Sequence, residues 1–167
     1  MTPAELLTEA FERVLETASG AVDGLTVEQL THRPEPDANT IGWLVWHLAR
    51  VQDDHVADVA GTEQVWTTQG FAERFDLPFD AEATGFGQDA DEVGEVRAEA
   101  GLLTEYVSAV HDQTTSYVAS LTPDDLDRVV DTRWDPPVTL GVRLVSVISD
   151  DLQHAGQAAY LRGLLGA

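Results

Sequence analysis

Four long segments carry apolar residues at intervals of three and four, the spacing that places them on one face of an α-helix. They begin near residues 3, 40, 91 and 139 and end near residues 18–24, 61, 121 and 165. No segment shows the sustained alternation of apolar and polar residues that is typical of a half-buried strand. We therefore predict an all-α fold, an antiparallel four-helix bundle that forms a single domain over residues 1–167.

Capping residues mark the expected helix ends. Thr2 precedes a proline at the first helical position, and Asn39 or Thr40 and then Thr139 stand before the second and fourth helices. Shorter capped turns begin at Thr26 and Thr122, and an extended segment, DTRWDPPVT, follows the second turn. Each turn and proline-rich link leads into a long helix, as "LTVEQL…NTIGW" and "LTPDDL…VTLGV", which indicates a faint internal repeat.

A long connection separates the second and third helices. Residues 62–94 hold one tryptophan and four phenylalanines among glycines, prolines and acids, with a short helix possible over residues 63–75. Long loops in compact domains often serve as lids or binding loops. The alternative is a packed connector that places its phenylalanines on the core.

The composition excludes several kinds of chemistry. The chain has no cysteine, so disulfides, thiolate zinc sites and a cysteine nucleophile are absent, and it has no lysine for Schiff-base formation. Its net charge of -21 repels phosphate backbones and anionic lipid, so we expect neither a nucleic-acid nor a membrane partner. The acidic N-terminus lacks a signal-peptide pattern, and we expect a cytoplasmic protein.

Polar residues interrupt two of the apolar segments. Asp150 and His154 are four residues apart, so on a helix they share one face. His47 lies in the segment NTIGWLVWHLARV, on the same helical face as Trp43 and Asp54. The core side of the fourth helix is expected to hold Leu144, Val145, Ile148, Leu152, Ala155 and Ala159, and Asp151 to point elsewhere.

We interpret His47, Asp150 and His154 as ligands of one divalent metal. Imidazole and carboxylate donors suit zinc, nickel or iron, and three protein ligands leave a position open for water or substrate. The alternative is a surface ion pair between Asp150 and His154. His55 ranks lower as a ligand, and His32 and His111 are expected on the surface or satisfied within the protein. A serine hydrolase is excluded because no G-x-S-x-G motif is present and Ser149 cannot align with its neighbours as a triad.

The segments NTIGWLVWHLARVQDDH and VTLGVRLVSVISDDLQHAGQAAYLRGLL together resemble the DinB-like superfamily of metal-binding four-helix bundles. The nearest branch is the actinobacterial one that includes mycothiol-dependent maleylpyruvate isomerase. The resemblance covers nearly the whole chain and places metal ligands at His47, Asp150 and His154. Asp150 departs from the pattern, because relatives carry glutamate or histidine there. The chain also ends where the isomerase continues into another domain, so isomerisation itself is not expected.

The resemblance implies a metal-dependent transferase or isomerase, in which the metal favours the thiolate of a low-molecular-weight thiol that attacks an electrophilic small molecule. Zinc is the expected metal, and a homodimer is expected by analogy. Arg50, Arg143 and Arg162 could bind a substrate carboxylate, and Asp54 and Gln157 are further candidate substrate contacts. The alternative function is a non-catalytic metal- or ligand-binding bundle.

Overall fold

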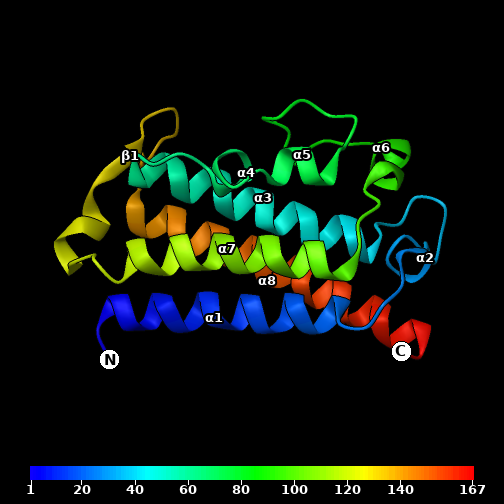
Figure 1. Cartoon of the computed structure of the whole chain (residues 1–167). Coiled ribbons are helices and arrows are strands. Elements are labelled where there is room, and N and C mark those ends of the chain that lie inside the picture. Colours follow the sequence, from blue (N-terminus) through cyan, green and yellow to red (C-terminus); the bar gives the residue numbers. More distant parts are fainter.

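The computed structural model describes all 167 residues, and four long helices form its body (Figure 1). These are α1 (Pro3–Val22), α3 (Ile41–Ala60), α7 (Ala100–Val118) and α8 (Leu140–Leu165). Helices α1 and α8 run in one direction and α3 and α7 in the other (Figure 1). Each of α1 and α3 packs on both α7 and α8, so α1 and α3 lie on a diagonal of the bundle. The predicted all-α four-helix bundle with a long crossover is confirmed; of its contacting pairs, α1–α7 and α3–α8 are antiparallel, as expected, whereas α1–α8 and α3–α7 are parallel.

The expected capping residues stand at the ends of the long helices. The Thr2, Thr40 and Thr139 side chains each accept a hydrogen bond from a backbone N–H in the first turn of the helix that follows. Gly61 ends α3 with a φ of 69°, in the left-handed region that glycine adopts without strain. These local signals therefore fix where α1, α3 and α8 begin and where α3 stops.

The faint internal repeat corresponds to one contact that occurs in both halves of the chain, in which a glycine at the start of a long helix lies against the short helix before it. A short helix with a capping box precedes α3 and α8 in each half: α2 (Val27–Leu30) and the 3-10 helix η1 (Pro123–Asp127). A Cβ added to Gly42 would lie 3.3 Å from the Leu30 carbonyl oxygen, and one added to Gly141 would lie 3.3 Å from that of Leu126. The extended segment after η1 forms a two-stranded antiparallel hairpin, β1 (Val129–Asp131) with β2 (Val138–Thr139).

The crossover between α3 and α7 covers one side of α3 (Figure 1). It contains α4 (Val65–Thr68), α5 (Phe71–Phe75) and α6 (Ala90–Glu95). Trp66, Phe71 and Phe75 are buried, as the packed-connector interpretation expects, but Phe86 is 92% exposed. Because the crossover covers it, α3 is buried nearly all round.

The predicted third helix over residues 91–121 is wrong at its start. The chain is helical in α6, leaves the helix at residues 96–99, and becomes helical again in α7. Val96 and Ala98 are buried whereas Arg97 and Glu99 are exposed, the alternation of an extended segment. Extended backbone lets both apolar side chains enter the core where a helix would turn them apart.

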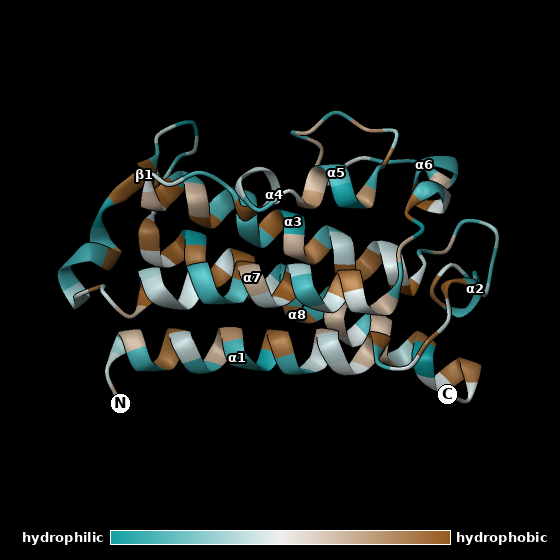
Figure 2. Cartoon of the chain, viewed as in Figure 1, coloured by the Kyte–Doolittle hydropathy of each residue, from teal (hydrophilic) through white to brown (hydrophobic).

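Buried apolar residues form two clusters, and brown and teal segments alternate along the long helices (Figure 2). Between the clusters, each of three helices contributes a buried polar residue: Gln52, Thr114 and Asp151. The Gln52 Nε2 donates to the Thr114 Oγ1 at 2.8 Å. Asp151 is completely buried and neither carboxyl oxygen has a hydrogen-bond partner. Burial, followed by the charge of Asp150, raises the pKa of Asp151 well above its usual value.

The predicted core face of α8 is therefore partly wrong. Val145, Leu152 and Ala159 are exposed, and Asp151 is buried. The buried residues are Leu140, Leu144, Val147, Asp151, Ala155 and Ala158. Helix α8 has apolar side chains on two faces, and the sequence pattern does not show which face meets the bundle. None of the helices has the length and apolar character needed to cross a membrane.

Candidate metal centre

Helices α3 and α8 pack side by side and bring His47, Asp150 and His154 together. One potential ligand atom from each residue lies within 4.8 Å of those of the other two. The His154 Nε2 is 3.6 Å from the Asp150 Oδ1, and the two imidazole centroids are 4.9 Å apart. The three residues that the sequence singled out thus form one cluster, although they come from positions more than 100 residues apart.

The imidazole ring of His47 is held by a hydrogen bond and by stacking. Its Nδ1 is 2.5 Å from the Thr84 carbonyl oxygen. Since a carbonyl only accepts, Nδ1 donates and carries the proton, which leaves the Nε2 lone pair free. Trp43 stacks on the same ring with a centroid separation of 4.5 Å. Burial lowers the pKa of His47, which favours the neutral imidazole that a metal ion requires.

The side chains of His154 and Asp150 also present ligand atoms that are free to bind a cation. The His154 Nδ1 donates to the Gln157 Oε1 at 3.1 Å, so its Nε2 faces Asp150. The Asp150 Oδ2 is buried and has no hydrogen-bond partner. Buried carboxylate oxygens are normally satisfied, so this orphaned oxygen suits a cation as its missing partner.

The dimensions of the cluster fit a divalent ion. Zinc binds histidine nitrogen and carboxylate oxygen at about 2.0–2.2 Å, which places tetrahedral ligands roughly 3.4 Å apart. The separation of 3.6 Å between the His154 and Asp150 atoms is close to that value, and the upper limit of 4.8 Å requires small side-chain rotations. No fourth histidine or carboxylate belongs to the cluster. This donor set can therefore hold one ion and leave coordination positions open.

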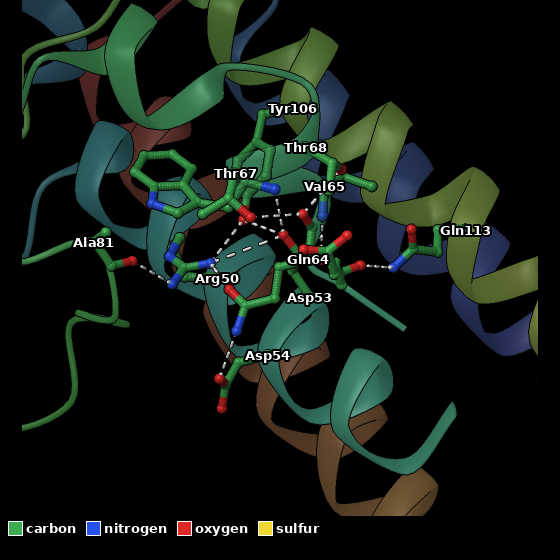
Figure 3. Close-up of polar contacts among 12 residues, drawn as sticks. Arg50, Asp53, Asp54, Gln64, Val65, Thr67, Thr68, Ala81, Tyr106 and Gln113 are labelled. Carbon is green, nitrogen blue, oxygen red and sulfur yellow. Dashed lines mark hydrogen bonds and ion pairs between the residues drawn. The ribbon is translucent and has the colours of Figure 1, made fainter. Parts of the chain in front are cut away.

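Of the predicted substrate contacts, only Gln157 lies at the cluster. Arg50 is completely buried and donates to the carbonyl oxygens of Ala81 and Ala83, and Gln64 connects it to Asp54 (Figure 3). Arg50 is thus not placed to meet a solute. The Asp54 carboxylate accepts from Gln64 in the same network.

The two remaining arginines are also engaged within the protein. The Arg143 guanidinium donates to the His55 Nδ1 at 2.7 Å and to the Asp131 carboxylate at 3.1 Å. His55 therefore belongs to this ion-pair cluster and not to the metal centre. Arg162 donates to the Ala21 and Asp23 carbonyl oxygens and ties the end of α8 to the end of α1.

Two other histidines lie apart from the centre. His32 is exposed, as expected. His111 is buried, and its Nε2 is 3.3 Å from the Glu12 carboxylate. Neither joins the three-residue cluster.

A cavity of about 360 Å³ lies beside Gln157, and none of the three candidate ligands lines it. Gln157 lines it and also holds His154, which links the cavity to the cluster. Its lining residues are Asp37, Ala38, Asn39, Leu44, Gln157, Tyr160 and Leu161. The cavity is the size of a small-molecule site and offers both apolar and hydrogen-bonding groups.

Sequence reasoning missed the role of the crossover at this centre. Thr84 binds His47, and Gly85 lies directly against it. The only signal was the pair of glycines in TGFGQ, which marks a sharp turn but does not indicate which helix the turn meets.

The fold and the cluster define a DinB-like four-helix bundle with a candidate metal site between α3 and α8. A family model described as "Mycothiol-S-transferase" matches residues 6–167, so the chain belongs to the mycothiol S-transferase family. The chain is also similar to a solved structure, a conserved protein from Enterococcus faecalis, at 33% identity and a TM-score of 0.92 over 100% of this chain and 99% of that one. A search of curated proteins finds no match.

Proposed function

We propose that the protein is a divalent-metal-dependent transferase that joins a low-molecular-weight thiol of the mycothiol type to an electrophilic small molecule. The observation that carries this proposal is the convergence of His47, Asp150 and His154, with both Nδ1 atoms held by oxygen acceptors and both Nε2 atoms free. Membership of the mycothiol S-transferase family supports the reaction class.

The side chains present would hold the ion through the two Nε2 atoms and the Asp150 carboxylate, and zinc suits this donor set best, with nickel or iron as other choices. A bound ion supplies Lewis acidity, which lowers the pKa of a thiol and favours the thiolate at neutral pH. Thr84 and Gln157 fix the tautomer and orientation of the two imidazoles.

The chain's own residues also limit where the substrates bind. The protein has no cysteine, so the reacting sulfur has to come from a second molecule. The cavity lies beside Gln157, which contacts His154, and Asn39, Gln157 and Tyr160 offer hydrogen-bonding groups to a polar thiol there. Leu44 provides apolar surface on the α3 side.

One observation favours the alternative, a non-catalytic metal- or ligand-binding bundle. Arg50, Arg143 and Arg162 all bind groups within the protein, so few cationic groups remain to orient an anionic substrate. The absence of a fourth ligand in the cluster favours the enzyme, because structural metal sites are usually closed by four protein ligands.

Metal content tests the proposal first. The purified protein is expected to hold one divalent ion per chain, and His154→Ala to lose it because one of three ligands is removed. His32→Ala, which changes an exposed histidine remote from the cluster, should retain the ion. Equal metal content in both variants would refute the site.

A conjugation assay then tests the reaction. The metal-loaded protein is expected to consume mycothiol and an electrophile together, and His154→Ala to show only the uncatalysed rate. Stoichiometric metal without any conjugation would support the non-catalytic alternative.

We also propose a single domain, a homodimer and a cytoplasmic location. Exposed apolar residues follow one face of α8 and support the dimer; they are Val142, Val145, Leu152, Tyr160 and Leu164. Sedimentation velocity would test this, and a monomer at micromolar concentration would rule the dimer out.

A further inference from the structure

We propose that residues 76–89 of the crossover form a positioning loop for the metal ligand His47, and that Gly85 and Arg50 are its positioning residues. This inference rests on the proposed metal site. The loop contributes no side chain to the metal centre. It acts on His47 through the backbone carbonyl of Thr84.

Three residues on one face of α3 bind the positioning loop. The Trp43 Nε1 donates to the Gln88 Oε1 at 2.7 Å, and the His47 Nδ1 donates to the Thr84 carbonyl. One turn further along, the Arg50 Nε donates to the Ala83 carbonyl at 3.0 Å and its Nη2 to that of Ala81 at 3.2 Å. The carbonyl that orients His47 is thus held on both sides.

Gly85 allows the close approach that this hydrogen bond needs. It is buried, with a φ of +93°. A Cβ at this position would lie 2.7 Å from the His47 Nδ1 and 3.0 Å from the Trp46 Cζ3. Atoms cannot remain at such distances, so any side chain would displace the loop or the imidazole.

Arg50 is itself held by several polar contacts (Figure 3). Its guanidinium is completely buried and donates to the Gln64 Oε1 at 2.7 Å and the Tyr106 hydroxyl at 3.3 Å. Its Nη1 lies 3.8 Å from the Asp53 carboxylate, which is anchored by the backbone N–H groups of Val65 and Trp66. Burying an arginine is costly unless its donors are paired, and here the paired acceptors include two carbonyls of the positioning loop.

The hydrogen bond to Thr84 determines where the Nε2 lone pair of His47 points. While Thr84 accepts from Nδ1, the imidazole is held in the tautomer and orientation that direct Nε2 toward Asp150 and His154. Loss of this hydrogen bond frees the ring to rotate and the proton to move to Nε2. Outer partners of this kind commonly contribute about 10- to 100-fold to metal affinity.

Two glycines of the loop provide a matched test. Gly85 and Gly87 both have a positive φ, of +93° and +79°, so alanine is strained at either position. A Cβ at Gly87 meets nothing within 4 Å, whereas one at Gly85 meets His47. Titration with Co²⁺ alone, followed by its visible absorption, measures both affinity and coordination geometry. Thermal unfolding of the metal-free proteins measures stability.

Gly85→Ala is expected to weaken Co²⁺ binding by about 10- to 100-fold and to change the absorption spectrum. Gly87→Ala is expected to bind Co²⁺ as the wild type does and to lose only the thermal stability that backbone strain costs, because its Cβ meets nothing. Equal affinities in Gly85→Ala and the wild type would overturn the inference and leave the metal site standing. A wild type that binds no Co²⁺ would overturn the proposed function, and this inference with it.

A second pair of variants covers the case in which Gly85→Ala does not fold. Gln88→Ala removes the hydrogen bond to Trp43, and Gln113→Ala removes a comparable side-chain bond to the Glu63 carbonyl, away from the metal centre. Gln88→Ala is expected to weaken Co²⁺ binding by about tenfold, and Gln113→Ala to leave it unchanged. Equal effects of the two variants would show that the positioning loop does not act on His47.

Discussion

At the scale of single residues, Asp131 is a buried carboxylate whose pKa is strongly lowered by its partners. It accepts from the backbone and side chain of Arg133 and from Arg143. The Arg133 hydrogen bonds, more than any other cause, hold the pKa of Asp131 well below its usual range. The folded state therefore favours the ionised form more strongly than the unfolded chain does.

The sign of the pH dependence follows from this lowered pKa. The stabilisation by Asp131 is fully present above its ordinary pKa of about 3.9 and is lost as the pH falls below that value. We expect Asp131→Asn to lower the melting temperature at pH 7, and the difference from the wild type to shrink as the pH falls toward 3. Thermal unfolding with a chelator present, from pH 7 to pH 3, measures it.

Asp127→Asn is the control for this prediction, because Asp127 is exposed and makes no ion pair. It is expected to melt as the wild type does at every pH. A constant difference between Asp131→Asn and the wild type across the pH range would contradict the argument.

Single residues also show how far the sequence predicts the candidate site. His47, Asp150 and His154 could be predicted because helical periodicity places Asp150 and His154 on one face, and the resemblance to the DinB-like superfamily joins His47 to them. Thr84 and Gly85 could not, since their contact with His47 depends on the path of a loop that lacks periodicity. Burial of Asp151 could not be predicted either, because a charged residue is almost never expected inside a core.

At the scale of helices, glycine sets how closely α3 approaches its neighbours. A Cβ at Gly42 would lie 3.3 Å from the Leu30 carbonyl oxygen and 3.4 Å from that of Val96. A Cβ at Gly156 in α8 would meet nothing within 4 Å. The same residue type therefore has a packing role at one position and only a cost in helix propensity at the other.

We expect Gly42→Ala to lower the free energy of unfolding by about 1–3 kcal/mol, because the added methyl group crowds two backbone carbonyls. Gly156→Ala should raise it by about 0.5–1 kcal/mol through the higher helix propensity of alanine. Urea denaturation of the metal-free proteins measures both values. A gain in stability for Gly42→Ala would show that the contact has room to relax.

The same scale shows why some helix boundaries were predictable and others were not. Thr2, Thr40, Gly61 and Thr139 act locally, so the sequence alone indicates where α1, α3 and α8 begin and where α3 ends. Residues 96–99 between α6 and α7 contain no proline or glycine, although Gly94 and Gly101 stand near them, and the break accompanies the packing of Val96 and Ala98. Tertiary packing overrides helical periodicity there.

At the scale of the whole molecule, the crossover gives the bundle its arrangement. Because the chain returns along the length of α3 before α7 begins, α3 and α7 run in the same direction (Figure 1). The same return places residues 76–89 over the α3 face that carries His47. The sequence predicted a long crossover, but which helix face it covers is decided by burial of its aromatic residues.

The acidic charge also belongs to the whole molecule. A net charge of -21 at pH 7 destabilises the compact state through self-repulsion, and salt screens that repulsion. We expect the melting temperature of the chelated protein at pH 7 to rise by about 2–8 °C between 0.05 and 0.5 M NaCl, equivalent to about 1–2 kcal/mol. At a pH near the isoelectric point of about 4.2, the same salt should have little effect, because attraction and repulsion are then both screened. A salt effect of equal size at both pH values would indicate preferential exclusion of the salt and not relief of repulsion.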